Sequence, residues 1–287
     1  DAIKRNFKHL WDYPLPKVMA NDIIDVFAEL KKDGRTTDYM MSIFRAFRAM
    51  WRSSKKLKTP VPDVLDDIVE MLPIPVKIHR VVYTPDQLKL LLAAVEDDPI
   101  THGIITCLIH SLCRISEVLA LGRQDVDIED KRIIITRQVL KKPDEDGSRF
   151  GPHKTFRTHG PRAIRMTNTL AKELKSLSPA LAAMKLRAGG EWQDNDLWFP
   201  TSIGTPYNYS SWESRFWLPI FKRTGLPRIR VHDIRHSAIT YLLSEGIPLT
   251  TVQEIAGHAD FKTTLGYTHM MLDTQNAAMD KLDKAMR

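Results

Sequence analysis

The sequence has 287 residues, 43% of them hydrophobic, and a formal net charge of +7 at pH 7. This size and composition allow one large or two smaller packed domains and exclude a wholly disordered chain. No apolar run approaches the ~18 residues that span a bilayer, and the two cysteines, Cys107 and Cys113, have neither zinc-site nor disulfide-framework spacing. We therefore expect a cytoplasmic protein. Because the first residue is Asp rather than Met, we also expect a fragment of a longer chain.

The positive charge is concentrated in three stretches that contain no acidic residue. Residues 45–58 carry six basic residues, and residues 149–165 and 215–230 carry five each. A solvated surface usually mixes both signs of charge. Stretches of a single sign therefore favour contact with phosphates over a role in solubility alone.

The first 72 residues have the periodicity of helices, most clearly around residues 40–55. An apolar stripe on this helix is formed by Met40, Ile43, Phe44, Phe47, Met50 and Trp51. One position round the helix lie basic residues at the same spacing, followed by one more lysine: Arg45, Arg48, Arg52, Lys55 and Lys56. Such a basic rim can lie along a DNA groove, although a solvated cationic rim is an equally good interpretation of this helix alone.

Residues 73–83 interrupt the helical pattern with two prolines and alternating β-branched residues, which predicts an extended linker. A new helix then begins clearly. Thr84 can be its N-cap, Pro85 takes the first helical position, and Gln87 completes a capping box. We place the domain boundary here, with a helical domain over residues 1–72 and a second domain over residues 84–287.

The second domain is predicted to be helical around a few short antiparallel strands. An apolar helix over residues 104–121 ends at Gly122. Short strands then flank an acidic turn at Glu129 and Asp130, and others surround the "HGP" of residues 159–161. From about residue 168 the pattern is helical again, with a polar loop near residues 200–209. The expected fold is thus mostly α, with a small antiparallel β-sheet.

Arg114 is unusual because it lies within an apolar helical run, where a charge is costly unless it is paired. Glu117, one turn later, could pair with it. A buried structural ion pair explains the arginine if it stands alone. The alternative is a guanidinium held rigid by that carboxylate and directed at a phosphate.

The segment "VHDIRH" places His232 and Arg235 at a helix start, where Asp233 can cap and where an anion is favoured. His232 and His236 also lie four residues apart, as metal ligands do. The motif lacks the Glu of H-E-x-x-H, so a third ligand would have to be His258 or His269. We expect no metal. Lys154, predicted to lie on a short hairpin, would attract no attention by itself.

Together, Arg114 in "RISEVLAL", Lys154 with Thr155, "HDIRH", "GHAD" and "YTH" resemble the tyrosine recombinase/integrase family in order and approximate spacing. The resemblance covers about residues 84–275, which would form the α+β catalytic domain, and the preceding helices resemble that family's core DNA-binding domain. One departure is "HSLC" before Arg114, where the family usually has a glycine close to the arginine.

The resemblance implies site-specific DNA recombination without a metal or cofactor. Tyr267 would attack phosphorus and form a 3′-phosphotyrosine intermediate, which conserves the bond energy for rejoining. Lys154 would protonate the departing 5′-oxygen, and Glu117 would orient one of the arginines. The remaining residues would serve as the base (His232), as a hydrogen-bond donor to phosphate (His258) and as holders of the non-bridging oxygens (Arg114 and Arg235).

The resemblance also implies partners. These are double-stranded DNA attachment or crossover sites, a homotetramer on two duplexes, and accessory DNA-bending proteins, in a nucleoid-associated setting typical of mobile elements. A tail helix over residues 271–287 would dock on a neighbouring protomer through Leu272, Met279, Leu282 and Met286, or in cis on its own domain. The alternatives are a type IB-like topoisomerase, a catalytically inactive DNA-binding regulator and, more remotely, a metal phosphohydrolase.

Overall fold

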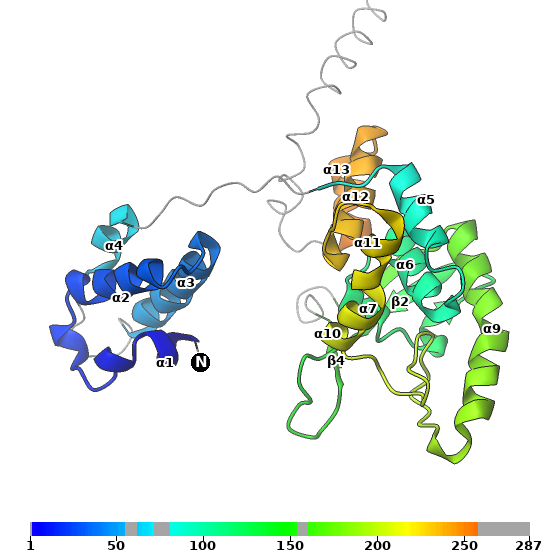
Figure 1. Ribbon diagram of the computed structural model, residues 1–287, viewed down its shortest axis with the longest axis horizontal. Coiled ribbons are helices and arrows are strands. Elements are labelled where there is room, and N and C mark those ends of the chain that lie inside the picture. The colour runs from blue at the N-terminus through cyan, green and yellow to red at the C-terminus, as the bar shows by residue number, and fades with distance from the viewer. Residues whose placement is uncertain (1, 55–61, 72–80, 154–159, 258–287) are drawn as a thin grey trace, which may run out of the picture. The chain divides into compact units, whose positions relative to one another are not determined.

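A computed structural model describes residues 2–54, 62–71, 81–153 and 160–257 of the chain (Figure 1). The chain divides into two compact units, Asp1–His79 and Arg80–Arg287. Residues 73–80 of the linker expected over residues 73–83 lie outside the described residues, so the linker and the domain boundaries stay predictions. Among the residues described, no helix is both long and apolar enough to cross a membrane.

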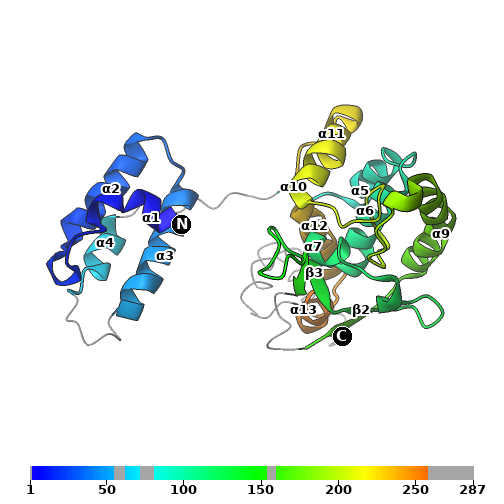
Figure 2. The same ribbon diagram turned by 90° about the horizontal axis from the view of Figure 1, so that it is seen from below.

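All the regular elements described in the N-terminal unit are helices or 3-10 turns (Figure 2). Its core contains a stack of aromatic rings, in which Phe7 lies 5.1 Å from Phe47 and Phe47 lies 5.3 Å from Trp51 between ring centroids. The elements are α1 (Ala2–Asn6), α2 (Ala20–Lys32), α3 (Thr37–Ser54) and α4 (Leu65–Met71), with 3-10 turns η1 (Lys8–Leu10) and η2 (Leu15–Lys17).

Helix α3 carries the predicted apolar stripe, and five of its six members are buried. Met50 is the exception, with 38% of its surface exposed. Met50 lies at the edge of the stripe, about 80° from its centre at 100° per residue, and therefore it is only partly covered. It still lines an apolar cavity together with Phe47 and Trp51.

In its described residues, the second unit combines helices with five short strands, as expected for a mostly α fold with a small antiparallel sheet. Its helices are α5 (Pro85–Ala93), α6 (Pro99–Ser111), α7 (Ile115–Val118), α9 (Asn168–Ala188), α10 (Tyr209–Trp212), the π-helical η5 (Glu213–Trp217), α11 (Leu218–Thr224), α12 (Val231–Ser244) and α13 (Leu249–Ala256). Two 3-10 turns, η3 (Arg123–Asp125) and η4 (Gly189–Glu191), also occur.

The strands pair antiparallel in two small sheets. The first has the order β1-β2-β5, with Ile133 opposite both Val126 and Ile164, and the second pairs β3 with β4. The turn at Glu129 and Asp130 thus joins two paired strands, as the sequence predicted. The strands are β1 (Val126–Asp127), β2 (Arg132–Ile135), β3 (Arg137–Val139), β4 (Phe150–Pro152) and β5 (Arg162–Arg165).

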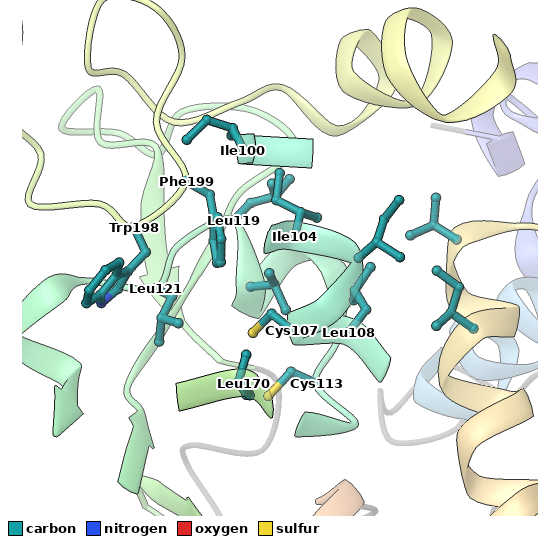
Figure 3. Packing of buried hydrophobic residues seen from close by; sticks show 14 of the residues in the cluster. Ile100, Ile104, Cys107, Leu108, Cys113, Leu119, Leu121, Leu170, Trp198 and Phe199 are labelled. Carbon is teal, nitrogen blue, oxygen red and sulfur yellow. The ribbon is translucent and has the colours of Figure 1, made fainter. Parts of the chain in front are cut away.

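Helix α6 lies at the centre of this unit, with α9 on one side and α12 on the other (Figures 1 and 2). Its side chains Ile104, Cys107 and Leu108 pack in the middle of the core (Figure 3). Gly103 permits the close approach of α9, because a Cβ atom there would meet Leu177 and Phe199 at 2.9 Å.

The continuous helix predicted over residues 104–121 is interrupted. Helix α6 ends at Ser111, Leu112 adopts the left-handed conformation with φ 54°, and α7 begins at Ile115. The Ser111 hydroxyl supports the break, because it donates to the Cys107 carbonyl at 2.6 Å and accepts from the Cys113 amide at 3.2 Å. Arg114 therefore lies at the N-cap of α7 rather than inside a helix.

Candidate functional site

Arg114 and Glu117 form a closed pair at the start of α7. The Arg114 backbone amide donates to Glu117 Oε2, and its Nη1 donates to Oε1, both at 2.9 Å. The Glu117 side chain is 1% exposed, whereas that of Arg114 is 21% exposed. The pairing expected from the sequence is present, and it leaves part of the Arg114 guanidinium accessible.

Arg162, at the start of β5, joins this pair, and the sequence analysis did not single it out. Its Nη2 donates to Glu117 Oε2 at 3.0 Å, and its Nη1 donates to the Ile255 carbonyl at 3.0 Å. The signal available in the sequence was strand alternation: Arg162 lies two residues before Ile164, which is 4% exposed, so both point to the same face of β5.

Arg235 is buried on α12, with 1% of its surface exposed. One of its Nη atoms donates to the Leu112 carbonyl, the other to the Ala256 carbonyl at 2.6 Å, and its buried Nε has no hydrogen-bond partner among the described residues. Burial, assisted by the charge of Arg114, lowers the pKa of Arg235 to about 10. The side chain is nevertheless fully charged at neutral pH.

In the described part of the site, the guanidinium groups of Arg114 and Arg162 therefore pair with a single carboxylate, that of Glu117, and Arg235 adds a third positive charge. Burial alone would raise the pKa of Glu117, but the charges of Arg162 and Arg114 outweigh burial and hold that pKa below its usual value. Glu117 is therefore ionised at neutral pH, and the four side chains together carry two positive charges in excess. Such a cluster favours an anion.

His232 lies in the first turn of α12 and is exposed, whereas His236 is buried. Their rings are 4.6 Å apart between centroids in an edge-to-face arrangement. Asp233 caps the helix, since its carboxylate accepts from the Arg230 backbone amide at 2.9 Å. In the described ranges, no group of three or more His, Cys, Asp or Glu side chains could hold a metal ion. His258 and His269, the other ligands considered, lie outside those ranges.

Three of the expected catalytic residues, Lys154, His258 and Tyr267, lie outside the described residues. Their neighbours in the sequence are described. His153, immediately before Lys154, is 3% exposed, and its Nε2 lies 3.1 Å from the Gly160 carbonyl. The two residues that flank residues 154–159 are therefore within hydrogen-bond distance of each other. Gly257 ends α13 with φ 64°, a left-handed conformation that glycine adopts readily at helix ends.

The basic rim expected on α3 is exposed at Arg45, Arg48 and Arg52. Arg45 also donates from Nε to the Met41 carbonyl at 3.2 Å. Lys55 and Lys56 lie outside the described residues, and contact of this rim with DNA stays a prediction.

The sequence matches the profile of a known protein family. The profile of the phage integrase family matches residues 82–272. The chain is 29% identical over 182 residues to a tyrosine recombinase XerC-like protein of Caldanaerobacter subterraneus, covering 59% of this chain and 46% of that protein. It is also 29% identical over 177 residues to the integrase of Staphylococcus phage L54a, covering 60% of this chain and 48% of that protein. The chain thus spans about half the length of these curated relatives.

Solved structures show the same fold. The Tn1549 transposon integrase in complex with transposon right end DNA gives a TM-score of 0.79 at 21% identity, covering 98% of this chain and 92% of that one. The XerH site-specific recombinase bound to palindromic difH substrate gives a TM-score of 0.70 at 17% identity, covering 97% of this chain and 77% of that one.

Proposed function

Because the chain belongs to the phage integrase family, we propose that it is a site-specific DNA recombinase that cuts and rejoins strands through a 3′-phosphotyrosine intermediate. One observation carries the proposal: Arg114 and Arg162 share the single carboxylate of Glu117, and Arg235, which interacts electrostatically with the same three residues, adds a further positive charge. The excess charge suits a phosphodiester, whose transition state gains negative charge on its non-bridging oxygens.

Arg114 and Arg235 are the proposed holders of those two oxygens. Arg114 is fixed by Glu117 through its backbone and its side chain, and Arg235 keeps one buried Nε–H unused by the described residues. Donors held in place before the reaction require no reorganisation, and losing one typically costs about 3 to 4 kcal/mol of transition-state stabilisation. This arrangement can stabilise the developing charge without a divalent metal.

The remaining roles follow from the chemistry of strand exchange. A tyrosine hydroxyl has an unperturbed pKa near ~10, so Tyr267 needs a base to attack at neutral pH. His232, exposed at the start of α12, is the proposed base. Lys154 is the proposed acid for the departing 5′-oxygen, and His258 the proposed hydrogen-bond donor to phosphate.

The proposed DNA partners are attachment or crossover sites of a mobile element, in the nucleoid, with accessory DNA-bending proteins. Two similar structures contain comparable partners: the Tn1549 integrase is in complex with transposon right end DNA, and XerH is bound to difH substrate. The exposed arginines of α3 and the basic stretches at residues 149–165 and 215–230 support contact with a polyanion.

A homotetramer on two duplexes is the proposed active assembly. The catalytic unit offers an apolar cavity of about 510 Å³ that could accept a tail helix from a neighbouring protomer. The cavity lies between α5, α6, α12 and α13, and its apolar lining includes Leu88, Leu92, Ile109, Ala238, Leu242 and Ile255.

The decisive experiment uses candidate attachment-site DNA with a nick beside the cleavage point, which releases a short fragment and traps the covalent complex. The parent protein should give an adduct on a denaturing gel, in the presence of EDTA as well as in its absence. Tyr267→Phe should bind the DNA and give no adduct, because only the nucleophilic oxygen is removed. Tyr13→Phe, which changes a 48% exposed tyrosine of the N-terminal unit, is the matched control and should behave like the parent.

An adduct formed by Tyr267→Phe would refute the assignment of the nucleophile. If the parent forms no adduct on any attachment site, the proposal fails and the inactive regulator becomes the better interpretation. Relaxation of supercoiled DNA by monomers, without exchange of strands between duplexes, would instead indicate the topoisomerase. An adduct that EDTA abolishes would indicate metal chemistry.

A further inference from the structure

Arg162 connects two elements of the site and has no role in the scheme above. It is 13% exposed, and its guanidinium reaches in two directions from the start of β5. One side donates to Glu117 on α7, and the other donates to the Ile255 carbonyl on α13, each at 3.0 Å. The same Nη2 also lies 3.4 Å from Cys113 Sγ. Arg162 thus links the segment that carries Arg114 to the end of a separate helix.

The C-terminal end of α13 is held by arginines from three different elements. The last carbonyls of a helix lack intrahelical partners and carry partial negative charge, so guanidinium donors bind them favourably. Three consecutive carbonyls are used: Ile255 accepts from Arg162, Ala256 from Arg235 and Gly257 from Arg114, at 3.0, 2.6 and 3.4 Å. The two proposed phosphate-binding arginines are therefore placed against one helix end, and Arg162 is its third donor.

The contact between Arg162 and this helix end is close. A Cβ atom at Gly257 would lie 2.3 Å from Arg162 Nη1 and 2.8 Å from its Cζ. Gly257 also has φ 64°, a conformation that strains other residues. The guanidinium of Arg162 thus packs directly on the backbone of the turn, and the turn accepts it because residue 257 has no side chain.

We propose that Arg162 is a positioning residue. Through their shared partner Glu117, it keeps Arg114 aligned with the C-terminal end of α13, to which Arg235 also binds. This inference rests on the proposed strand-cleavage function. Without Arg162, Glu117 keeps one guanidinium partner and the Ile255 carbonyl loses its side-chain donor. The guanidinium group of Arg114 and the end of α13 could then shift relative to each other. A misplacement of about 1 Å can slow a reaction ~10²-fold, whereas binding of a long DNA site depends on many other contacts.

The test compares Arg162→Lys and Arg162→Gln with the parent protein on the nicked substrate. Lysine keeps the positive charge beside Glu117, but one ammonium group does not reproduce the planar fork that reaches two elements. Arg162→Lys should therefore melt near the parental temperature and bind DNA as the parent does. At saturating DNA it should form the covalent adduct about 10- to 100-fold more slowly, within the ~10²-fold that a misplacement of about 1 Å can cost. Arg162→Gln should be slower still.

Arg132→Gln is the matched control. Arg132 is an exposed arginine on β2, the strand paired with β5, and its loss should leave the cleavage rate unchanged. An Arg162→Lys variant that cleaves at the parental rate would overturn the inference. The inference would also be overturned if the Arg162 variants bound DNA more weakly and with a shallower salt dependence but cleaved saturating DNA at the parental rate. Arg162 would then be a direct phosphate contact. A parent that forms no adduct rejects the proposed function instead.

A double-mutant cycle tests the coupling to α13. Gly257→Ala introduces a Cβ atom where Arg162 lies, so it should slow cleavage by displacing that guanidinium. If both changes break the same link, the Gly257→Ala/Arg162→Gln variant should be no slower than the slower single variant. Defects that multiply would mean that the turn and Arg162 act independently, which would overturn the proposed coupling.

Discussion

A buried arginine such as Arg235 is costly to the folded state, because its charge leaves water and none of the described carboxylates pairs with it directly. Its hydrogen bonds go to two carbonyl oxygens, which compensate with partial charges only. Arg114 and Arg162 share the one carboxylate, Glu117. A cluster built for stability alone would balance its charges. The imbalance among the described residues supports the proposal that an anion completes the site.

The ionisation of Glu117 provides a pH test of this cluster. Folding lowers the pKa of Glu117. Between the folded-state and unfolded-state pKa values, the unfolded state therefore binds more protons than the folded state, and stability rises with pH. The stabilisation is fully present above the ordinary value of 4.5 and is lost as pH falls through the folded-state pKa. Glu117→Gln should cost about 3 to 5 kcal/mol at pH 7, the usual cost of breaking a buried pair, and should flatten the acid side of the stability profile.

Thermal unfolding between pH 7 and acid measures this effect. Glu245→Gln, which changes an exposed carboxylate after α12, is the control and should follow the parent at every pH. If Glu117→Gln and the parent lose stability in parallel on acidification, the carboxylate of Glu117 is not the group that titrates.

The proposed acid, Lys154, can be tested by the chemistry of the leaving group. Lys154→Ala should slow cleavage by about 10²- to 10⁴-fold, the range of general acid catalysis. A substrate with sulfur at the bridging 5′ position should restore the rate, because a thiolate leaves without a proton. Arg114→Ala and Arg235→Ala should not be restored, since they act on the non-bridging oxygens. A Lys154→Ala defect that persists on the sulfur substrate would assign the proton to another group, with His258 the next candidate.

At the scale of elements, local hydrogen bonds could be predicted from sequence and tertiary ones could not. Thr84 and Gln87 form the predicted capping box of α5, because every partner lies within four residues. The break at Leu112 was missed, since the run around it is strongly apolar without a Gly or Pro, and its left-handed conformation is supported by partners in the folded core. Arg162 was missed because its acceptors lie 45 and 93 residues away.

Helix α3 gives an element-scale prediction about DNA contact. If Arg48 and Arg52 each neutralise one phosphate, Arg48→Gln and Arg52→Gln should weaken binding equally for all DNA sequences. Each should also reduce the slope of log affinity against log salt by about 1. Lys31→Gln, an exposed charge on α2 in the same unit, should leave that slope unchanged. Slopes that match the parent for both arginine variants would favour the solvated rim over the DNA contact.

At the scale of the whole molecule, assembly depends on where the apolar stripe of residues 271–287 is buried. The stripe residues Leu272, Met279, Leu282 and Met286 lie outside the described residues, so both cis and trans docking stay open. The cavity between α5, α6, α12 and α13 has a size and apolar lining suited to such a stripe. Docking in trans would couple the placement of Tyr267 to synapsis, and cleavage would then require the complete assembly.

Two variants separate the alternatives when they are mixed. Deletion of residues 276–287 removes the tail, and Leu242→Glu places a charge in the cavity, which Leu242 helps to line. In trans docking, each variant alone should bind a single site normally and fail to pair two duplexes. The mixture should recover part of the pairing, because an intact tail can enter the intact cavity of the truncated partner. In cis docking, no molecule in the mixture has both parts, so pairing should stay lost. Gel-shift assays with two labelled duplexes distinguish these outcomes, and normal pairing by the truncated protein alone would exclude any role of the tail in synapsis.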